Sequence, residues 1–120
     1  VILVDTNAWV AHIRASDRQL VELLEQDRVV TCDVVLGELA LGIGLPNALR
    51  THLALLPMLP SPSAVETRRA IERRLPVFRA SGIGWADAQI IVAAAEAGAL
   101  LYSSDNAMRA VWRKLGFRLP

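Results

Sequence analysis

The stretch VILVDTN, residues 1–7, opens the chain and decides the expected fold. Its first four residues form a short, continuously apolar run, which is typical of a strand buried on both faces within a parallel sheet. Asp5 follows the run directly, where the carboxyl end of such a strand would lie. Because ligands bind open parallel sheets beyond the carboxyl ends of their strands, Asp5 is the first candidate functional residue.

Short apolar runs and helical patterns alternate along the rest of the chain. Further strands are expected at residues 28–32 and 99–103, and residues 117–119 could add an edge strand. Helices are expected at residues 16–26, from 33 to the glycines at 42 and 44, from 46 to about 56, and at 63–75, 85–97 and 105–115. This alternation predicts an α/β protein, a single domain over residues 1–120, with a central parallel sheet and helices on both faces.

Four acidic residues are placed to converge at the carboxyl edge of this sheet. Asp105 lies just past the strand expected at residues 99–103, as Asp5 lies past the first strand. Asp87 falls in the first turn of the helix leading into that strand, and Glu38 lies mid-helix among apolar neighbours, where an unpartnered charge is costly. Since no lysine or histidine lies near them, a divalent cation with oxygen ligands, Mg²⁺ or Mn²⁺, is the simplest partner for the four acids.

Each acid also has a purely structural interpretation. Asp5, Asp87 and Asp105 could each merely cap the helix that follows. Glu38 could form a buried ion pair with one of the twelve arginines.

The arginines and tryptophans leave similar alternatives open. The segment with Arg68, Arg69, Arg73, Arg74 and Arg79 is either a flank that contacts phosphates or a solvated face with Glu66 and Glu72 as i, i+4 partners. Three tryptophans could stack on bases or belong to the core: Trp9, Trp85 and Trp112. Trp85, beside Asp87, is the best candidate for a contact near the acids.

Composition limits the class of protein. Net charge is +1, and the apolar share of 53%, with a mean hydropathy of +0.36, fits either a sheet covered on both faces or an apolar patch for a partner. The longest uncharged run, residues 51–65, holds three prolines and is too short to cross a bilayer. The opening residues contain no basic leader, and Cys32 is the single cysteine. We therefore expect a cytoplasmic protein without a membrane segment.

Four segments together resemble a known family. VDTN (residues 4–7), VVLGELALGI (34–43), GWADAQIIVAAAEAG (84–98) and LLYSSDNAM (100–108) are similar, in this order, to the PIN-domain nucleases. They look most like the VapC-type toxins of bacterial and archaeal toxin–antitoxin pairs. Each motif alone is weak, but four in order over nearly the whole chain are specific. The resemblance implies a PIN-like fold with four or five parallel strands, and Mg²⁺- or Mn²⁺-dependent endonucleolytic cleavage of RNA by a metal-activated water.

The resemblance also assigns roles to individual residues. The catalytic, metal-binding acids would be Asp5, Glu38, Asp87 and Asp105. Thr6 would orient the carboxylate of Asp5, while Asn7 and Ser103 match polar positions beside the site. The family often has a further acid two residues after the last one, where this chain has Ala107. A second metal would then bind weakly or only with substrate.

Partners follow from the same resemblance, and one alternative function stays open. The family implies an RNA substrate, a cognate antitoxin that wraps the protein and blocks the acids, and a homodimer or a toxin–antitoxin hetero-oligomer. The alternative is a non-catalytic PIN-like module that binds RNA or protein. A haloacid-dehalogenase-type phosphatase is disfavoured, because Asn7 stands where that family needs Asp and Lys114 is the only lysine. No Gly-x-Gly-x-x-Gly follows the first strand, which argues against a dinucleotide-binding enzyme.

Overall fold

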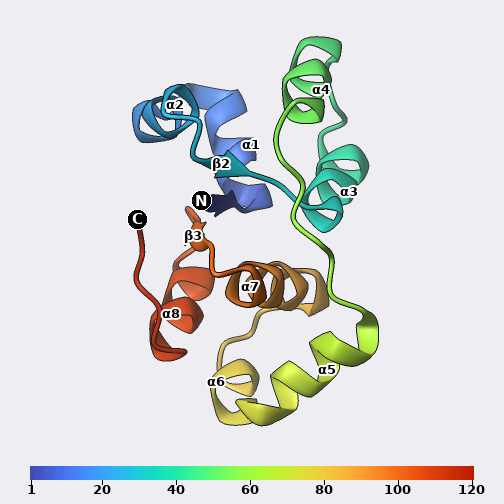
Figure 1. Cartoon of the computed structure of the whole chain (residues 1–120), viewed down its shortest axis with the longest axis vertical. Helices are drawn as coiled ribbons and strands as arrows, with labels where there is room; N and C mark the ends of the chain where they lie inside the picture. The colour runs from blue at the N-terminus through green and yellow to red at the C-terminus, as the bar shows by residue number, and fades with distance from the viewer.

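The computed structural model describes residues 1–120 and has a three-stranded parallel sheet at its centre (Figure 1). Strand β1 (Ile2–Val4) lies in the middle, between β2 (Val29–Val30) and β3 (Leu100–Tyr102). All three residues of β1 are completely buried, because the strand has a neighbour on each side and helices above and below. The continuous apolar run at the start of the chain therefore predicted a buried strand correctly.

Eight helices surround the sheet. In Figure 1, α1 and α2 lie on one side of it and α7 and α8 on the other, which confirms the predicted α/β architecture. Helices α5 and α6 lie beyond α7, and α3 packs against both α1 and α7. The helices are α1 (Thr6–Ala15), α2 (Arg18–Glu25), α3 (Asp33–Gly42), α4 (Asn47–Ala54), α5 (Ala64–Arg73), α6 (Leu75–Arg79), α7 (Trp85–Ala97) and α8 (Asn106–Lys114).

The expected number of strands, four or five, is wrong: the sheet has three. Residues 117–119 form no strand, because they fold back over α8. The ring of Phe117 stacks on the buried ring of Trp112 with centroids 4.4 Å apart, and the indole N–H of Trp112 donates to the carbonyl of Arg118 at 2.8 Å. Near the opposite edge of the sheet, Met58 forms only an isolated bridge with Thr31.

Local signals located most helix ends well. Helix α7 has the predicted bounds and ends at Gly98, whose φ of 66° lies in the left-handed region that glycine adopts without strain. Helix α2 falls inside the expected range of residues 16–26 and begins at Arg18, because Asp17 caps it. Helix α1 extends to Ala15 and leaves Ser16 at its carboxyl end. No helix is long and apolar enough to span a membrane.

Candidate active site

The register of the sheet brings Asp5 next to the segment that follows β3. Val4 pairs with Tyr102, and the backbone N–H of Asp5 donates to the carbonyl of Tyr102 at 2.9 Å. The next residues, Asp5 and Ser103, therefore leave the sheet side by side. The Ser103 hydroxyl donates to Asp5 Oδ2 and accepts the backbone N–H of Asp105 at 3.0 Å. One buried hydroxyl thus links the first and the last of the four acids.

Asp5 and Asp105 both cap helices, and each uses only one carboxylate oxygen to do so. Asp5 Oδ1 accepts the N–H of Ala8 at 2.9 Å in α1, and Asp105 Oδ1 accepts the N–H of Ala107 at 2.7 Å in α8. Asp5 Oδ2 accepts from Ser103, while Asp105 Oδ2 accepts the amide of Asn7 at 3.2 Å. The capping interpretation is therefore correct for these two residues but describes only half of each carboxylate.

Glu38 reaches the same edge from α3, without a basic partner. Its Oε1 accepts the hydroxyl proton of Thr6 at 2.7 Å, across the contact between α1 and α3. The chain contains a single ion pair, Arg68–Glu72, so the alternative of a buried ion pair for Glu38 is wrong. The expectation that Thr6 orients Asp5 is also wrong, because Ser103 and Ala8 hold that carboxylate and Thr6 binds Glu38 instead.

Asp87 completes the cluster from the first turn of α7, where it is half-buried. Burial raises its pKa, and the charges of Glu38 and Asp105 raise it further. Burial likewise raises the pKa of Asp5 to about 6, against hydrogen bonds from Ser103 and Ala8 that lower it, with Asp87 and Asp105 adding to the rise. Asp5 thus feels the charges of Asp87 and Asp105, and Asp87 feels those of Glu38 and Asp105. The four predicted acids therefore lie in one region of negative charge.

The chemistry of this donor set suits a hard divalent cation. All the donors are oxygens, and none of the four acids is neutralised by an ion pair. No three His, Cys, Asp or Glu side chains are arranged closely enough to hold a metal ion by themselves. Mg²⁺ commonly keeps several waters and binds one or two carboxylates together with substrate phosphates, so the residues fit such an ion without forming a closed cage. That the four acids bind a metal stays a prediction.

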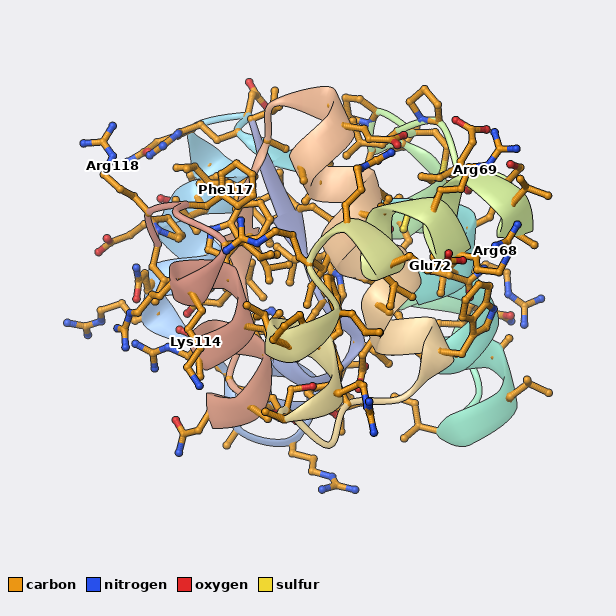
Figure 2. All side chains as sticks on the ribbon, turned by 90° about the horizontal axis from the view of Figure 1, so that it is seen from below. Arg68, Arg69, Glu72, Lys114, Phe117 and Arg118 are labelled. Carbon is orange, nitrogen blue, oxygen red and sulfur yellow. The ribbon has the colours of Figure 1, made fainter.

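The arginine-rich segment is partly accounted for by structure. Arg68 pairs with Glu72 one turn along α5, and Figure 2 shows both side chains on the outer side of that helix with Arg69. Glu66 does not pair with an arginine, because its carboxylate accepts the backbone N–H of Ser63 at 3.2 Å in a capping box. The solvated-face interpretation therefore holds for Arg68 and Glu72.

The tryptophans divide between the core and the surface. Trp9 and Trp112 are 2% and 0% exposed, so neither can stack on a base. Trp85 is 47% exposed at the first position of α7, two residues before Asp87. It stays the one tryptophan available to a ligand at the acids.

The sequence patterns missed one feature beside the acids. A cavity of about 300 Å³ adjoins Ser103, with Gln19, Tyr102 and Arg109 in its lining. These residues come from α2, β3 and α8, and no shared motif or spacing connects them along the chain.

Comparisons with known proteins identify the family of this chain. The family model of the PIN domain matches residues 2–114. This chain belongs to the PIN-domain family. Ribonuclease VapC32 of Mycobacterium tuberculosis, in the strains CDC 1551 / Oshkosh and ATCC 25618 / H37Rv, is 37% identical to this PIN domain over 120 residues, which cover 98% of this chain and 95% of the relative.

A solved structure supports the PIN fold independently. The crystal structure of FitAcB from Neisseria gonorrhoeae contains a chain that superposes with a TM-score of 0.63 at 21% identity. The match covers 92% of this chain and 93% of that chain. The resemblance seen in the four sequence segments is therefore confirmed for the family and for the fold.

Proposed function

We propose that this PIN domain is a divalent-metal-dependent endoribonuclease and the toxin of a toxin–antitoxin pair. The observation that carries the proposal is the meeting of four acids from separate elements, beyond the carboxyl ends of β1 and β3, with no base to neutralise them. The full-length similarity to a protein named a ribonuclease supports RNA as the substrate.

In this proposal Asp5, Glu38, Asp87 and Asp105 hold Mg²⁺ or Mn²⁺. When bound, such an ion lowers the pKa of a water and stabilises charge that develops on a phosphodiester. The polar neighbours hold the carboxylates in place. Ser103 donates to Asp5, Thr6 to Glu38 and Asn7 to Asp105. These contacts fix the orientation of three acids before substrate arrives, which reduces the ordering required in the transition state.

Asp87 differs from the other three acids. No side chain donates a hydrogen bond to it, and its pKa is raised by burial and by Glu38 and Asp105. A carboxylate with a raised pKa accepts a proton more readily. The pKa of Asp5 is raised as well, but both of its oxygens already accept hydrogen bonds, from Ala8 and Ser103. Asp87 is therefore the acid better placed to take the proton of the attacking water.

The direct test is cleavage of RNA by the purified chain. Incubation of total RNA with the protein and Mg²⁺ or Mn²⁺ should give defined fragments, and excess EDTA should abolish them, because the acids would lose their cation. Sequencing of the fragment ends would then identify the target as transfer, ribosomal or messenger RNA. Metal binding without cleavage of any RNA would contradict the proposal and favour the non-catalytic binding module.

The antitoxin partner is supported by exposed apolar side chains. Leu41 near the end of α3 is 91% exposed and Leu55 after α4 is 79% exposed, and Ile43 beside α3 is 42% exposed. Solvating such side chains is unfavourable, and clusters of them commonly mark partner surfaces. We infer that a short antitoxin covers this part of the molecule.

Charged residues at Leu41 and Leu55 should weaken that contact. We expect a chain that carries both Leu41→Glu and Leu55→Glu to bind its inhibitor more weakly. When it is affinity-tagged and purified from the native host, the amount of inhibitor that co-purifies should fall at least about tenfold relative to the unmodified chain. The protein that co-purifies must also block RNA cleavage. Val65→Glu, at a 48% exposed apolar position on α5, is the control and should capture the inhibitor as well as the unmodified chain does. Recovery of only a free monomer or a homodimer from the native host, judged by size-exclusion chromatography, would contradict the proposal that an antitoxin binds this chain.

A further inference from the structure

A cavity of about 300 Å³ lies beside the acids, at the carboxyl end of β3. Ser103 belongs to both, since its hydroxyl donates to Asp5 and the residue is part of the cavity lining. The volume is at the lower end of the range for small-ligand pockets. A molecule in the cavity would therefore touch the same serine that positions the acids.

Arg109 is the only cationic residue in the lining. It lies one turn after Asp105 on α8, and its backbone N–H donates to the carbonyl of that residue at 3.0 Å. The side chain is partly buried, yet its guanidinium group makes no ion pair and no hydrogen bond with the protein. A partly buried arginine without a partner retains its full capacity to bind an anion.

The opposite wall is held in place by a hydrogen-bond network. The Tyr102 hydroxyl donates to Asp17 Oδ2, and Asp17 Oδ1 accepts the backbone N–H groups of Gln19 at 3.0 Å and Leu20 at 3.3 Å. This network joins β3 to the start of α2 and fixes the position from which Gln19 faces the cavity. The carboxamide of Gln19 and the hydroxyl of Ser104 have no hydrogen-bond partner in the protein and stay available to a ligand.

We propose that this cavity binds the RNA nucleotide next to the cleaved phosphodiester, with Arg109 on its phosphate and Gln19 on its base. The inference rests on the proposed function and deepens it. The four acids repel an RNA backbone, so affinity has to come from a nearby cation, and Arg109 is the cation one helical turn from Asp105. The planar guanidinium group suits a phosphate, and the apolar Leu119 in the lining, which is only partly buried, suits a base.

Binding measured without cleavage tests this role of Arg109. A fluorescent, short, single-stranded oligoribonucleotide of mixed sequence is titrated with the full chain in EDTA, so that the readout does not depend on activity. Arg109→Gln should weaken binding about tenfold, because it removes one charge-assisted contact. The matched control is Arg113→Gln, an exposed arginine one turn further along α8 and outside the cavity, which should change binding by less than about twofold. Thermal melting verifies that both variants are folded.

A second pair of variants tests the cavity without changing charge. Gln19→Trp fills the space from the exposed start of α2 and should also weaken binding about tenfold. Gln26→Trp, at the exposed end of the same helix, should leave binding unchanged. Equal affinities for the variants and their controls, or no binding by the unmodified chain, would overturn the inference.

The two proposals can fail separately. If the chain cleaves RNA with Mg²⁺ but Arg109→Gln and Arg113→Gln bind the oligonucleotide equally well, the proposed nucleotide site in the cavity is wrong and the proposed nuclease activity is supported. If the oligonucleotide binds in an Arg109-dependent way but no metal supports cleavage, the proposed nuclease activity is wrong, and the cavity is an RNA-binding site without a cleaved bond beside it. In an active enzyme, Arg109→Gln should raise KM about tenfold and leave kcat unchanged, since the contact is made equally in the ground state and the transition state.

Discussion

Asp87→Asn will cleave RNA at least about a thousandfold more slowly than the unmodified chain, at saturating Mg²⁺. The substitution keeps the size of the side chain but removes one of four negative charges and the group proposed to accept the proton of water. Folding should not suffer, because the folded structure disfavours the charged form of Asp87 and the neutral amide relieves that repulsion. Single-turnover cleavage rates and thermal melting, measured on the same preparations, check both halves of the prediction.

Glu96→Gln is the matched control for Asp87→Asn. It makes the same change of acid to amide at an exposed position near the far end of α7, away from the other acids. We expect normal cleavage from this variant. A comparable loss of rate in both variants would mean that overall charge, and not the acid cluster, governs cleavage. Near-normal cleavage by Asp87→Asn would show that Asp87 is not part of the active site.

Asp5→Asn should stabilise the metal-free protein at neutral pH while it destroys activity. Burial raises the pKa of Asp5 from 3.8 to about 6, so the folded state binds the proton more tightly than the unfolded state does. The free energy of unfolding therefore falls as pH rises from about 4 to 6, and the loss, about 3 kcal/mol, persists at higher pH. The raised pKa of Asp87 acts in the same direction.

The amide avoids this penalty but can accept only with one oxygen, so it loses one of two contacts, to Ala8 or to Ser103, at a cost of about 1 kcal/mol. We expect a net gain of about 2 kcal/mol at pH 8 in EDTA and no gain at pH 4. Urea unfolding at the two pH values measures the difference. A gain of equal size at both values would show that the charge of Asp5 is not the cause.

Mg²⁺ should reverse the order of stability of these two proteins. A ligand at a hundredfold excess over its Kd stabilises the folded state by about 2.7 kcal/mol, so the unmodified chain should gain stability and Asp5→Asn should gain little. Asp33→Asn, an exposed acid in the first turn of α3, is the control and should respond to Mg²⁺ normally. Together these measurements would show that the acids lower the stability of the metal-free fold in return for binding a cation.

The local sequence determined the elements that carry the site. The apolar run before Asp5 indicated a buried strand, because a strand covered on both faces shows no polar alternation. Residues 85–97 and Gly98 gave the bounds of α7, because glycine reaches the left-handed conformation that ends a helix. Since parallel strands end at one edge, the positions of Asp5 and Asp105 after two such strands also predicted that they lie near each other.

Only the tertiary structure decided which side chains meet. Ser103 and Asp5 are 98 positions apart in the chain, and Thr6 and Glu38 are 32 apart, so no local pattern could pair them. Residues 117–119 add no edge strand to the three-stranded sheet, and Phe117 packs on Trp112 instead, a contact that strand propensity alone does not predict. Arg109 faces a cavity for a similar reason: α2, β3 and α8 enclose it only once they pack together. Sequence patterns record how each element is buried, whereas the contacts between elements depend on the geometry of the whole fold.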